Sequence, residues 1–220
     1  MEEKLACRVG SWYRGATGVV AVEKLSGGAS QETWRFDIVH PEGNVGAVLR
    51  RAPKGYGAAP SRAAGLNAEV RLMQLAFDAS LPSPRVLHVL TPEDDLGVGF
   101  IMRRVDGETI ARKILREEEF ADARPRLARQ LGGVLAGIHS LPGTQLPELR
   151  SMTAAKELDE SERDYRNLNW PKPVFELALR WLRDHDPGPP TEATLVHGDF
   201  RNGNLIIGAD GVREIGRAHV

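Results

Sequence analysis

Short apolar runs separated by turn residues occupy the first hundred positions of the chain, which is the pattern of an antiparallel sheet. Residues 18–25 and 33–39 are rich in β-branched and aromatic side chains, and the small residues between them predict a hairpin. Residues 45–51 follow a turn cluster and predict a third strand. The prolines of segment 81–87 predict an extended entry into a fourth strand, and residues 99–105 predict the fifth.

One helical pattern interrupts these strands. Between the third and fourth strands, Leu66, Val70, Met73 and Phe77 recur every three or four residues, which predicts a helix with an apolar stripe facing a core. Ser61 is the candidate residue for capping the N-terminus of this helix.

Beyond residue 105, helical stripes replace the strands. One stripe ends at Ile138, before a Pro and a Gly that stop the helix, and residues 156–165 predict an exposed helix of mixed charge. Residues 174–183 predict a more apolar helix that is expected to bury Phe175, Leu179 and Leu182. Strands followed by helices indicate an α+β protein of two lobes, with the boundary near residues 103–108.

The composition is that of an ordinary globular protein, with 220 residues, 41% hydrophobic and 27% charged. Twenty-nine basic residues against thirty acidic ones give a net charge of −1, so binding to nucleic acid or to a membrane surface is not expected. No apolar run is long enough to span a membrane, and the start at Met1 lacks the features of a signal peptide. The single cysteine, Cys7, agrees with a reducing compartment, and we therefore expect a cytoplasmic protein.

A polar segment between two aliphatic runs, L-V-H-G-D-F-R-N-G-N-L-I-I at residues 195–207, carries the clearest chemistry. Asp199 and Asn204 have the separation found in the protein-kinase catalytic loop H-R-D-x-x-x-x-N, with Gly198 in place of the Arg. At this spacing a carboxylate can orient and deprotonate a hydroxyl while an amide oxygen holds Mg²⁺ against nucleotide phosphates. Arg201, two residues beyond the Asp, is placed to offset the charge of a transferring phosphoryl group. The alternative is a turn in which Asp199 and Asn204 only cap local backbone.

The tip of the first hairpin is a candidate phosphate site. It consists of Gly27, Gly28, Ala29 and Ser30, small residues that let backbone N–H groups approach phosphate oxygens. The alternative is an ordinary turn.

A cation on the third strand is a second candidate for holding phosphate. Arg50 stands where the kinase pattern V-A-I-K carries its Lys, and Arg51, which points to the opposite face, is the alternative. Glu69, on the following helix, is the candidate partner of Arg50, and the alternative there is a solvated helix charge.

The H-G-D-x-x-x-x-N loop, the L-S-G-G run at residues 25–28 and the V-x-G ending at residues 105–107 together resemble the aminoglycoside phosphotransferase and choline kinase family. The chain is similar to bacterial phosphotransferase family proteins and to the kinase-like domain that precedes some acyl-CoA dehydrogenases. The resemblance covers about residues 18–213. It implies a protein-kinase-like two-lobed fold, with a nucleotide-binding lobe of antiparallel sheet plus helix over residues 1–104 and an incomplete helical lobe over residues 105–213.

The same resemblance implies ATP and Mg²⁺ as cofactors and a small molecule with a hydroxyl group as substrate. Asp199 and Arg201 would serve catalysis, and Asn204 would hold the metal. Arg50, Glu69 and the hairpin tip would hold the phosphates, and Met102 with Arg103 would bind adenine through their backbone. The acceptor, the choice of ATP over GTP and the oligomeric state stay open.

Residues 214–220 depart from the family pattern. In the resembling proteins the strand after the turn at residues 208–211 leads into a second acidic magnesium ligand, whereas Glu214 arrives about three positions early. The seven residues can be back-translated as GAG ATC GGA AGA GCA CAC GTC, the start of a common sequencing-library adapter. We therefore expect a non-native tail on a truncated kinase, and a natural stop codon directly after Val220 in genomic DNA would overturn this.

Transfer of the γ-phosphoryl group of ATP to a hydroxyl is the function expected of the parent protein, with little or no turnover by the truncated chain. The alternative is a non-catalytic nucleotide-binding module with a regulatory role, whose function would survive Asp199→Ala. A protein kinase is a third possibility, and it is disfavoured because His197-Gly198-Asp199 lacks the Arg that pairs with a phosphorylated activation loop.

Overall fold

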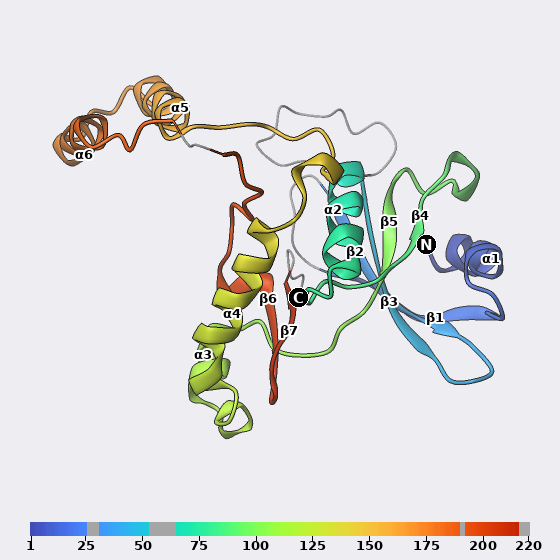
Figure 1. Ribbon diagram of the computed structural model, residues 1–220. Helices are drawn as coiled ribbons and strands as arrows, with labels where there is room; N and C mark the ends of the chain where they lie inside the picture. Colours follow the sequence, from blue (N-terminus) through green and yellow to red (C-terminus); the bar gives the residue numbers. More distant parts are fainter. Residues whose placement is uncertain (26–30, 53–64, 190–191, 216–220) are drawn as a thin grey trace. The chain divides into compact units, whose positions relative to one another are not determined.

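A five-stranded antiparallel sheet is built from residues between 18 and 103 (Figure 1). The spatial order of its strands is β1-β2-β3-β5-β4. They are β1 (Gly18–Leu25), β2 (Glu32–Val39), β3 (Val45–Ala52), β4 (Val86–Val89) and β5 (Val98–Arg103). All five predicted strands are confirmed, and the fifth ends at Arg103, where the linker was predicted to begin.

The computed structural model describes residues 1–25, 31–52, 65–189 and 192–215. The chain divides into two units, of which the first contains Met1–Glu148 with Leu195–Val220 and the second contains Leu149–Thr194. Gly27, Gly28, Ala29 and Ser30 lie outside the described residues, as does Ser61. None of the described helices is long and apolar enough to cross a membrane.

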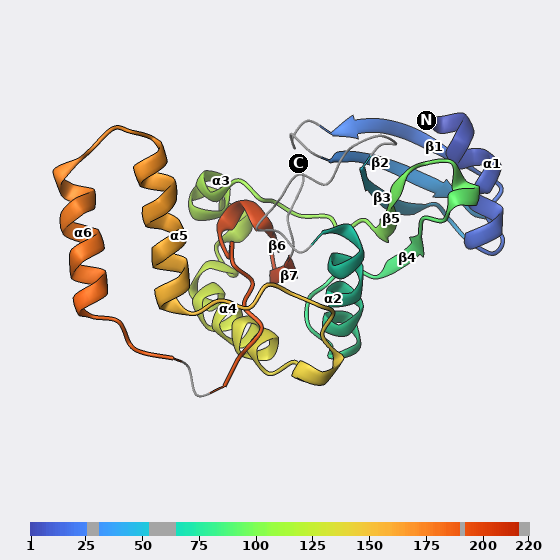
Figure 2. The ribbon, with the colours of Figure 1, turned by 90° about the horizontal axis from the view of Figure 1, so that it is seen from above.

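Helices cover both faces of the sheet (Figures 1 and 2). On one face, Leu5 of α1 (Glu2–Trp12) belongs to the same buried cluster as Leu49 of β3. On the other face, Val70 of α2 (Leu66–Asp78) shares a buried cluster with Val48 of β3. Because β3 is covered on both sides, its middle is a continuous buried run and not an alternation of buried and exposed residues.

The helix expected after the third strand is present, with two differences. It begins at Leu66 with Gly65 at its N-cap, where the φ of +79° suits glycine, so the cap is not Ser61. Leu66 and Val70 are buried as expected, but Phe77 is 45% exposed because the buried face turns to Leu75 and Ala76 at the end of the helix.

The rest of the first unit is a helical segment and a β-hairpin. The elements are α3 (Ala111–Arg116), α4 (Arg124–His139), β6 (Leu205–Gly208) and β7 (Gly211–Ile215). Short 3₁₀ segments lie at Pro92–Asp94, Glu118–Phe120, Gly143–Gln145 and Asn202–Asn204. Ile138 of α4 is buried with Leu205 and Ile207 of β6 in one cluster. The linker after β5 also joins β6, since Glu108 N donates to Ile207 O at 2.9 Å and Ile207 N donates to Glu108 O at 3.0 Å.

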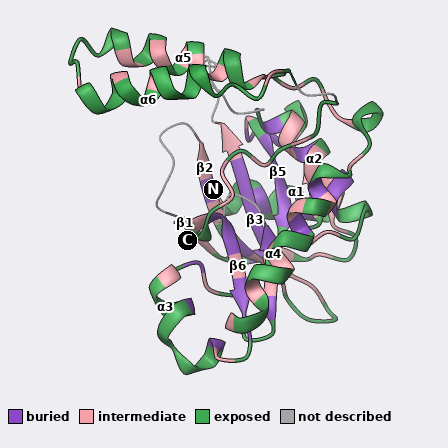
Figure 3. Ribbon diagram, turned by 60° about the vertical axis from the view of Figure 1, so that its left-hand side comes forward, coloured by how far each residue is buried: buried purple, intermediate pink, exposed green. Residues whose placement is uncertain are grey.

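The second unit is a pair of helices, α5 (Ala154–Asn167) and α6 (Pro173–Asp184), held to each other by polar contacts. The Tyr165 hydroxyl accepts a hydrogen bond from Lys172 N at 2.7 Å, and Arg166 forms an ion pair with Glu176. No residue of either helix is buried, as the absence of purple on α5 and α6 in Figure 3 shows. The expectation that Phe175, Leu179 and Leu182 are buried is therefore wrong for this unit. Phe175 packs edge-to-face with Tyr165 of α5, with the ring centroids 5.5 Å apart, but Phe175 stays 53% exposed and Leu182 47% exposed.

Candidate active site

The polar loop before β6 is organised around a contact between its two predicted functional residues. Asn204 is buried, at 4% exposure, and its Nδ2 donates to the Asp199 carboxylate oxygen Oδ2 at 2.8 Å and to the Asp199 backbone oxygen at 2.7 Å. The loop can turn this tightly because Gly198 takes a φ of +79° and residues 202–204 form one 3₁₀ turn. The buried amide therefore fixes the direction of the carboxylate.

Arg201 lies on the other side of the same carboxylate. Its Nε donates to Asp199 Oδ1 at 3.0 Å, and the Arg201 side chain is 66% exposed. Gly203 makes room for this pair, since a Cβ on Gly203 would come within 2.7 Å of Arg201 Nη1. The guanidinium thus neutralises the carboxylate in this structure and is open to solvent.

The apolar flanks of the loop predict two short buried strands, but only the strand after the loop forms. Before the loop, Leu195 packs against the buried cluster that contains Leu205, whereas Val196 is 65% exposed, and neither residue belongs to a strand. After the loop, Leu205 and Ile207 enter the buried cluster that contains α4. Before it, His197 supports the turn by accepting a hydrogen bond from Asp199 N on its Nδ1 at 3.3 Å. The His197 ring also packs edge-to-face with Phe200, with the ring centroids 5.5 Å apart. His197 therefore supports the conformation of the turn.

The structure brings Arg50 and Glu69 together. Arg50 is 3% exposed and forms an ion pair with Glu69, which stands in the first turn of α2. The Arg50 guanidinium also lies over the ring of Phe100, its cross-strand partner in β5, at 5.9 Å from the ring centroid. A third neighbour is Gln31, whose Oε1 accepts from Arg50 Nη2 at 2.7 Å.

Arg51 serves the opposite face of β3. Its Nη2 donates to Glu32 Oε2 at 2.7 Å, and its Nη1 donates to the backbone oxygen of Leu96 at 2.8 Å. Hydrogen bonds from Lys24 and then from Arg51 lower the pKa of the Glu32 carboxyl to about 2, although burial opposes the shift. Arg51 is thus bound into a network on the face away from α2, and Arg50 is the cation beside Glu69.

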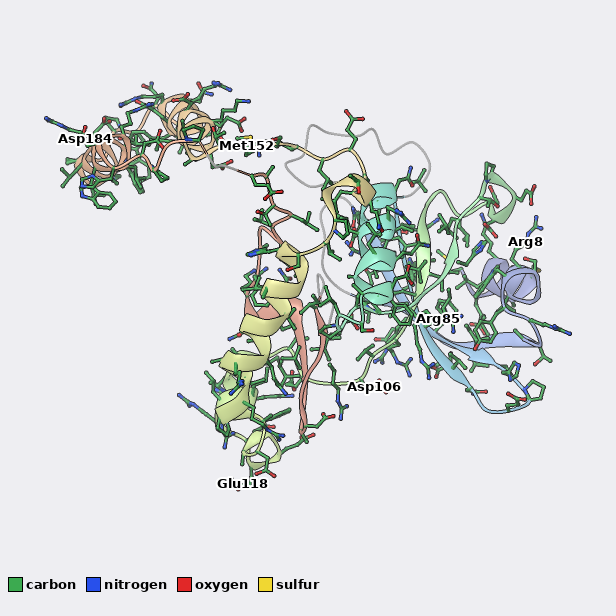
Figure 4. All side chains as sticks on the ribbon, in the orientation of Figure 1. Arg8, Arg85, Asp106, Glu118, Met152 and Asp184 are labelled. Carbon is green, nitrogen blue, oxygen red and sulfur yellow. The ribbon has the colours of Figure 1, made fainter. Side chains whose placement is uncertain are left out.

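The segment after β5 is tied to the sheet by its backbone and by one side chain. Arg103 N donates to the oxygen of Arg85, which Figure 4 labels, at 2.9 Å, so this N–H is used within the protein. Met102 is buried between β3 and β4 in the sheet. Arg104 N donates to Gly46 O at 2.9 Å, and the Arg104 guanidinium covers Gly46, where a Cβ would come within 2.8 Å of its central carbon. A nucleotide base bound beside the linker would therefore have to hydrogen-bond to the carbonyl oxygen of Arg103 or to an N–H group further along the linker.

An open, charged depression of about 650 Å³ lies beside this linker, on the face of the sheet that carries Arg50. Arg104 Nη1 donates to Asp37 Oδ1 at 2.7 Å within it, and Arg35 pairs with Glu23. The lining residues are Ala21, Val22, Glu23, Arg35, Asp37, Arg104 and Asp106. Most of the residues that line this depression are charged. A pocket for a nucleotide base is usually lined by apolar side chains, so this lining is not typical of one.

The oxygen atoms of the loop at residues 199–204 are of the kind that a magnesium ion shared with a nucleotide would accept. With Nδ2 of Asn204 turned to Asp199, its Oδ1 is the side-chain oxygen left to bind a cation. Across the described part of the chain, no cluster of three His, Cys, Asp or Glu side chains could hold a metal alone. Mg²⁺ commonly takes only one or two protein oxygens and completes its shell with phosphate and water, so this limited donor set fits such an ion.

Glu214 is the one acidic residue on the strand that returns from the hairpin turn. It pairs in register with Ile206 and is 5% exposed. Burial raises the pKa of its carboxyl to about 8. At neutral pH this group is therefore mostly protonated, which is a poor state for a metal ligand.

Comparison with known families assigns the chain to one of them. The sequence profile of the phosphotransferase enzyme family matches residues 21–216 of the chain. The chain belongs to this family. The match spans the sheet, α2, the linker and the Asp199–Asn204 loop, so the family assignment covers every described site residue.

Two curated proteins are similar in sequence to most of this chain. Acyl-CoA dehydrogenase family member 11 of Gallus gallus is 25% identical over 221 residues, which is 93% of this chain and 26% of that protein. Acyl-CoA dehydrogenase family member 10 of Mus musculus is 26% identical over 197 residues, which is 87% of this chain and 18% of that protein. The chain thus spans about a quarter or less of the curated relatives.

Solved structures of phosphotransferases confirm the kinase-like fold. A putative aminoglycoside phosphotransferase from Ralstonia eutropha has a TM-score of 0.72 and 20% identity, covering 97% of this chain and 63% of that one. Spectinomycin phosphotransferase, solved with ADP and spectinomycin, has a TM-score of 0.58 and 14% identity, covering 94% and 65%. The predicted α+β fold and the predicted family are both confirmed.

Two contacts around the predicted site were not anticipated from the sequence. Gln31 contacts Arg50, and Arg104 ties the linker to Asp37. The contact of Gln31 could have been predicted from the sequence. Gln31 immediately follows the glycine-rich tip and is two residues before Thr33, so it is expected on the same face as Thr33, which lies opposite Arg50. Arg104 carries none, because its partner is 67 residues away in sequence.

Proposed function

We propose that this family member is the nucleotide-binding and catalytic part of a small-molecule kinase that moves the γ-phosphoryl group of ATP to a hydroxyl. The observation that carries this proposal is the Asp199 carboxylate, held on one side by the buried Asn204 amide and on the other by the exposed Arg201. A carboxylate held in place beside a solvent-exposed cation is what hydroxyl activation and phosphoryl charge neutralisation require.

In the proposed reaction, Asp199 orients the acceptor hydroxyl and takes its proton as the oxygen attacks phosphorus. Arg201 leaves the carboxylate and turns to the oxygens of the transferring group, where charge accumulates. Asn204 would hold Mg²⁺, which neutralises phosphate charge when it is bound. Arg50, kept in place by Glu69, would hold the α- and β-phosphates through its planar fork of donors.

Several observations support nucleotide use without identifying the acceptor. The spectinomycin phosphotransferase with this fold was solved with ADP, and this family member carries a buried cation with a helix glutamate as partner. Because the chain spans a quarter or less of its curated relatives, the acceptor of the whole protein is itself open. Aminoglycosides, choline-like alcohols, amino alcohols and hydroxyacyl thioesters are the classes to screen.

We propose further that residues 1–220 alone turn over slowly or not at all. The only acid on β7 is Glu214, and its buried carboxyl is mostly protonated at neutral pH. A coupled assay that shows Mg²⁺-dependent ATP consumption by residues 1–220 would contradict this.

The deciding experiment compares Asp199→Ala with Asp210→Ala in the full-length protein, using the hydroxyl compounds above as acceptors. Loss of the carboxylate should lower the transfer rate by about 10²–10⁴-fold while ADP binding remains. Asp210 is an exposed carboxylate on the neighbouring hairpin turn, so its variant should keep the wild-type rate. Equal rates for wild type and Asp199→Ala, with ADP still bound, would favour the non-catalytic nucleotide-binding module.

A further inference from the structure

Gln31 contacts a different nitrogen of the Arg50 guanidinium from the one that pairs with Glu69. Glu69 pairs with Nη1 of Arg50, and the Gln31 side-chain oxygen accepts from Nη2 at 2.7 Å. Gln31 is also the first described residue after the glycine-rich tip and directly precedes β2. One carboxamide therefore connects the end of the hairpin with the buried cation of β3.

Glu69 and Gln31, the partners of Arg50 among the described residues, differ in charge, and this difference decides which of the two a ligand can replace. A guanidinium that is 3% exposed has lost its water, so its N–H donors need protein partners when no ligand is present. Glu69 is an anion and forms the stronger, charge-paired contact. Gln31 offers a neutral oxygen, so an incoming phosphate oxygen gains more at Nη2 than the carboxamide loses there.

A carboxamide can also contact the ligand that displaces it. Its oxygen only accepts hydrogen bonds, but its NH₂ group donates two. Thr33 lies opposite Arg50 in the β2–β3 register, and Gln31 is two residues before Thr33, on the same face. Rotation about the terminal torsion of Gln31 would exchange its oxygen for Nε2 without moving the backbone.

We propose that Gln31 is an exchangeable phosphate-binding residue: its Oε1 holds Arg50 Nη2 until a phosphate oxygen of a nucleoside di- or triphosphate takes that donor, and its Nε2 then donates to the same phosphate. This inference rests on the proposed function, because it assumes that Arg50 binds nucleotide phosphate. It adds a role for a neutral residue that the structure shows in contact with the cation.

The test compares Gln31→Glu and Gln31→Met in the full chain, with ADP and adenosine as calorimetric ligands. A glutamate keeps an acceptor for Arg50 and strengthens it, but it cannot donate to phosphate and repels it. Gln31→Glu should therefore weaken ADP binding by about tenfold or more, Gln31→Met by less, and neither should change adenosine binding beyond about twofold. Gln145→Glu, an exposed glutamine in a 3₁₀ segment of the same unit, is the matched control and should bind both ligands like the wild type.

The outcomes separate this inference from the function on which it rests. ADP binding by Gln31→Glu that equals the wild type would overturn the exchange and leave Gln31 as a support for Arg50. Parallel loss of adenosine and ADP binding would also overturn it, because the defect would then not concern phosphate. If wild-type protein binds ADP no more tightly than adenosine, the phosphate role of Arg50 fails first, and the proposed function fails with it.

Discussion

The side-chain nitrogen of Asn204 donates to both the carboxylate and the backbone oxygen of Asp199, across five positions of sequence. One buried amide thus sets both the fold of the loop and the direction of its reactive group. Stability and catalysis are therefore expected to respond together when this amide is removed, which is unusual for a residue with a purely chemical role.

Asn204→Ala is predicted to lower the free energy of unfolding by about 1–3 kcal/mol, because it removes the two hydrogen bonds that the buried amide donates to Asp199. The transfer rate of the full-length protein should fall more than this stability loss explains, since Asp199 also loses its orientation. Thermal melts and transfer assays measure the two effects. Asn202→Ala, at an exposed position of the same 3₁₀ turn, is the control and should change neither. A stable Asn204→Ala protein with wild-type rates would contradict the role assigned to the amide.

Arg50→Met is predicted to destabilise the protein by about 2–3 kcal/mol, because Glu69 would lose its cation while remaining three-quarters covered. Arg50→Lys should be milder, since it keeps the charge but loses the fork that reaches both Glu69 and Gln31. Denaturant unfolding of these variants, alone and with Glu69→Gln, gives the coupling energy of the pair. Arg71→Met, at an exposed position of α2, should leave stability unchanged. Additive effects of Arg50→Met and Glu69→Gln would show that the pair contributes nothing.

Glu214 is predicted to make stability fall as pH rises. Its folded-state pKa is raised to about 8 from 4.5, so the folded protein binds more protons than the unfolded chain between these values. The stability that this protonated carboxyl contributes is fully present below about pH 4.5 and is lost as the pH rises through 8. Glu214→Gln removes this titration. At pH 9 the variant should therefore melt at a higher temperature than the wild type, and its free energy of unfolding should be larger by about 2–4 kcal/mol. Glu93→Gln, at an exposed position, serves as the control, and identical pH profiles for wild type and Glu214→Gln would refute the prediction.

The α5–α6 pair is predicted to depend on one hydroxyl more than on its apolar side chains. Tyr165→Phe removes the hydrogen bonds of the hydroxyl to Lys172 N and to Glu176, and should speed amide exchange in both helices by an amount equivalent to about 1 kcal/mol. Leu177→Ala should have little effect, because that side chain is 68% exposed. Hydrogen exchange by mass spectrometry resolves the two helices. Greater loss of protection from Leu177→Ala would mean that an apolar surface covers this face.

The parts of the fold and site that depend on local pattern could be predicted from sequence. Strand positions follow from apolar alternation and turn residues, and the Asp199–Asn204 contact follows from a spacing that one loop imposes. The Arg50–Glu69 pair could be predicted because the strand and the helix that carry the two residues follow each other in the chain. What failed depends on distant packing: which residues at the end of α2 are buried, and how far Phe175 and Leu182 stay exposed. Such features are set by neighbours that a local pattern does not contain.

The contact between Gly46 and Arg104 has a consequence for how related sequences can diverge. The guanidinium lies on the glycine, so a residue with a Cβ at position 46 would have to displace the end of the Arg104 side chain from its place beside Asp37. Homologues with a larger residue at position 46 should accordingly tend to carry a shorter one at position 104.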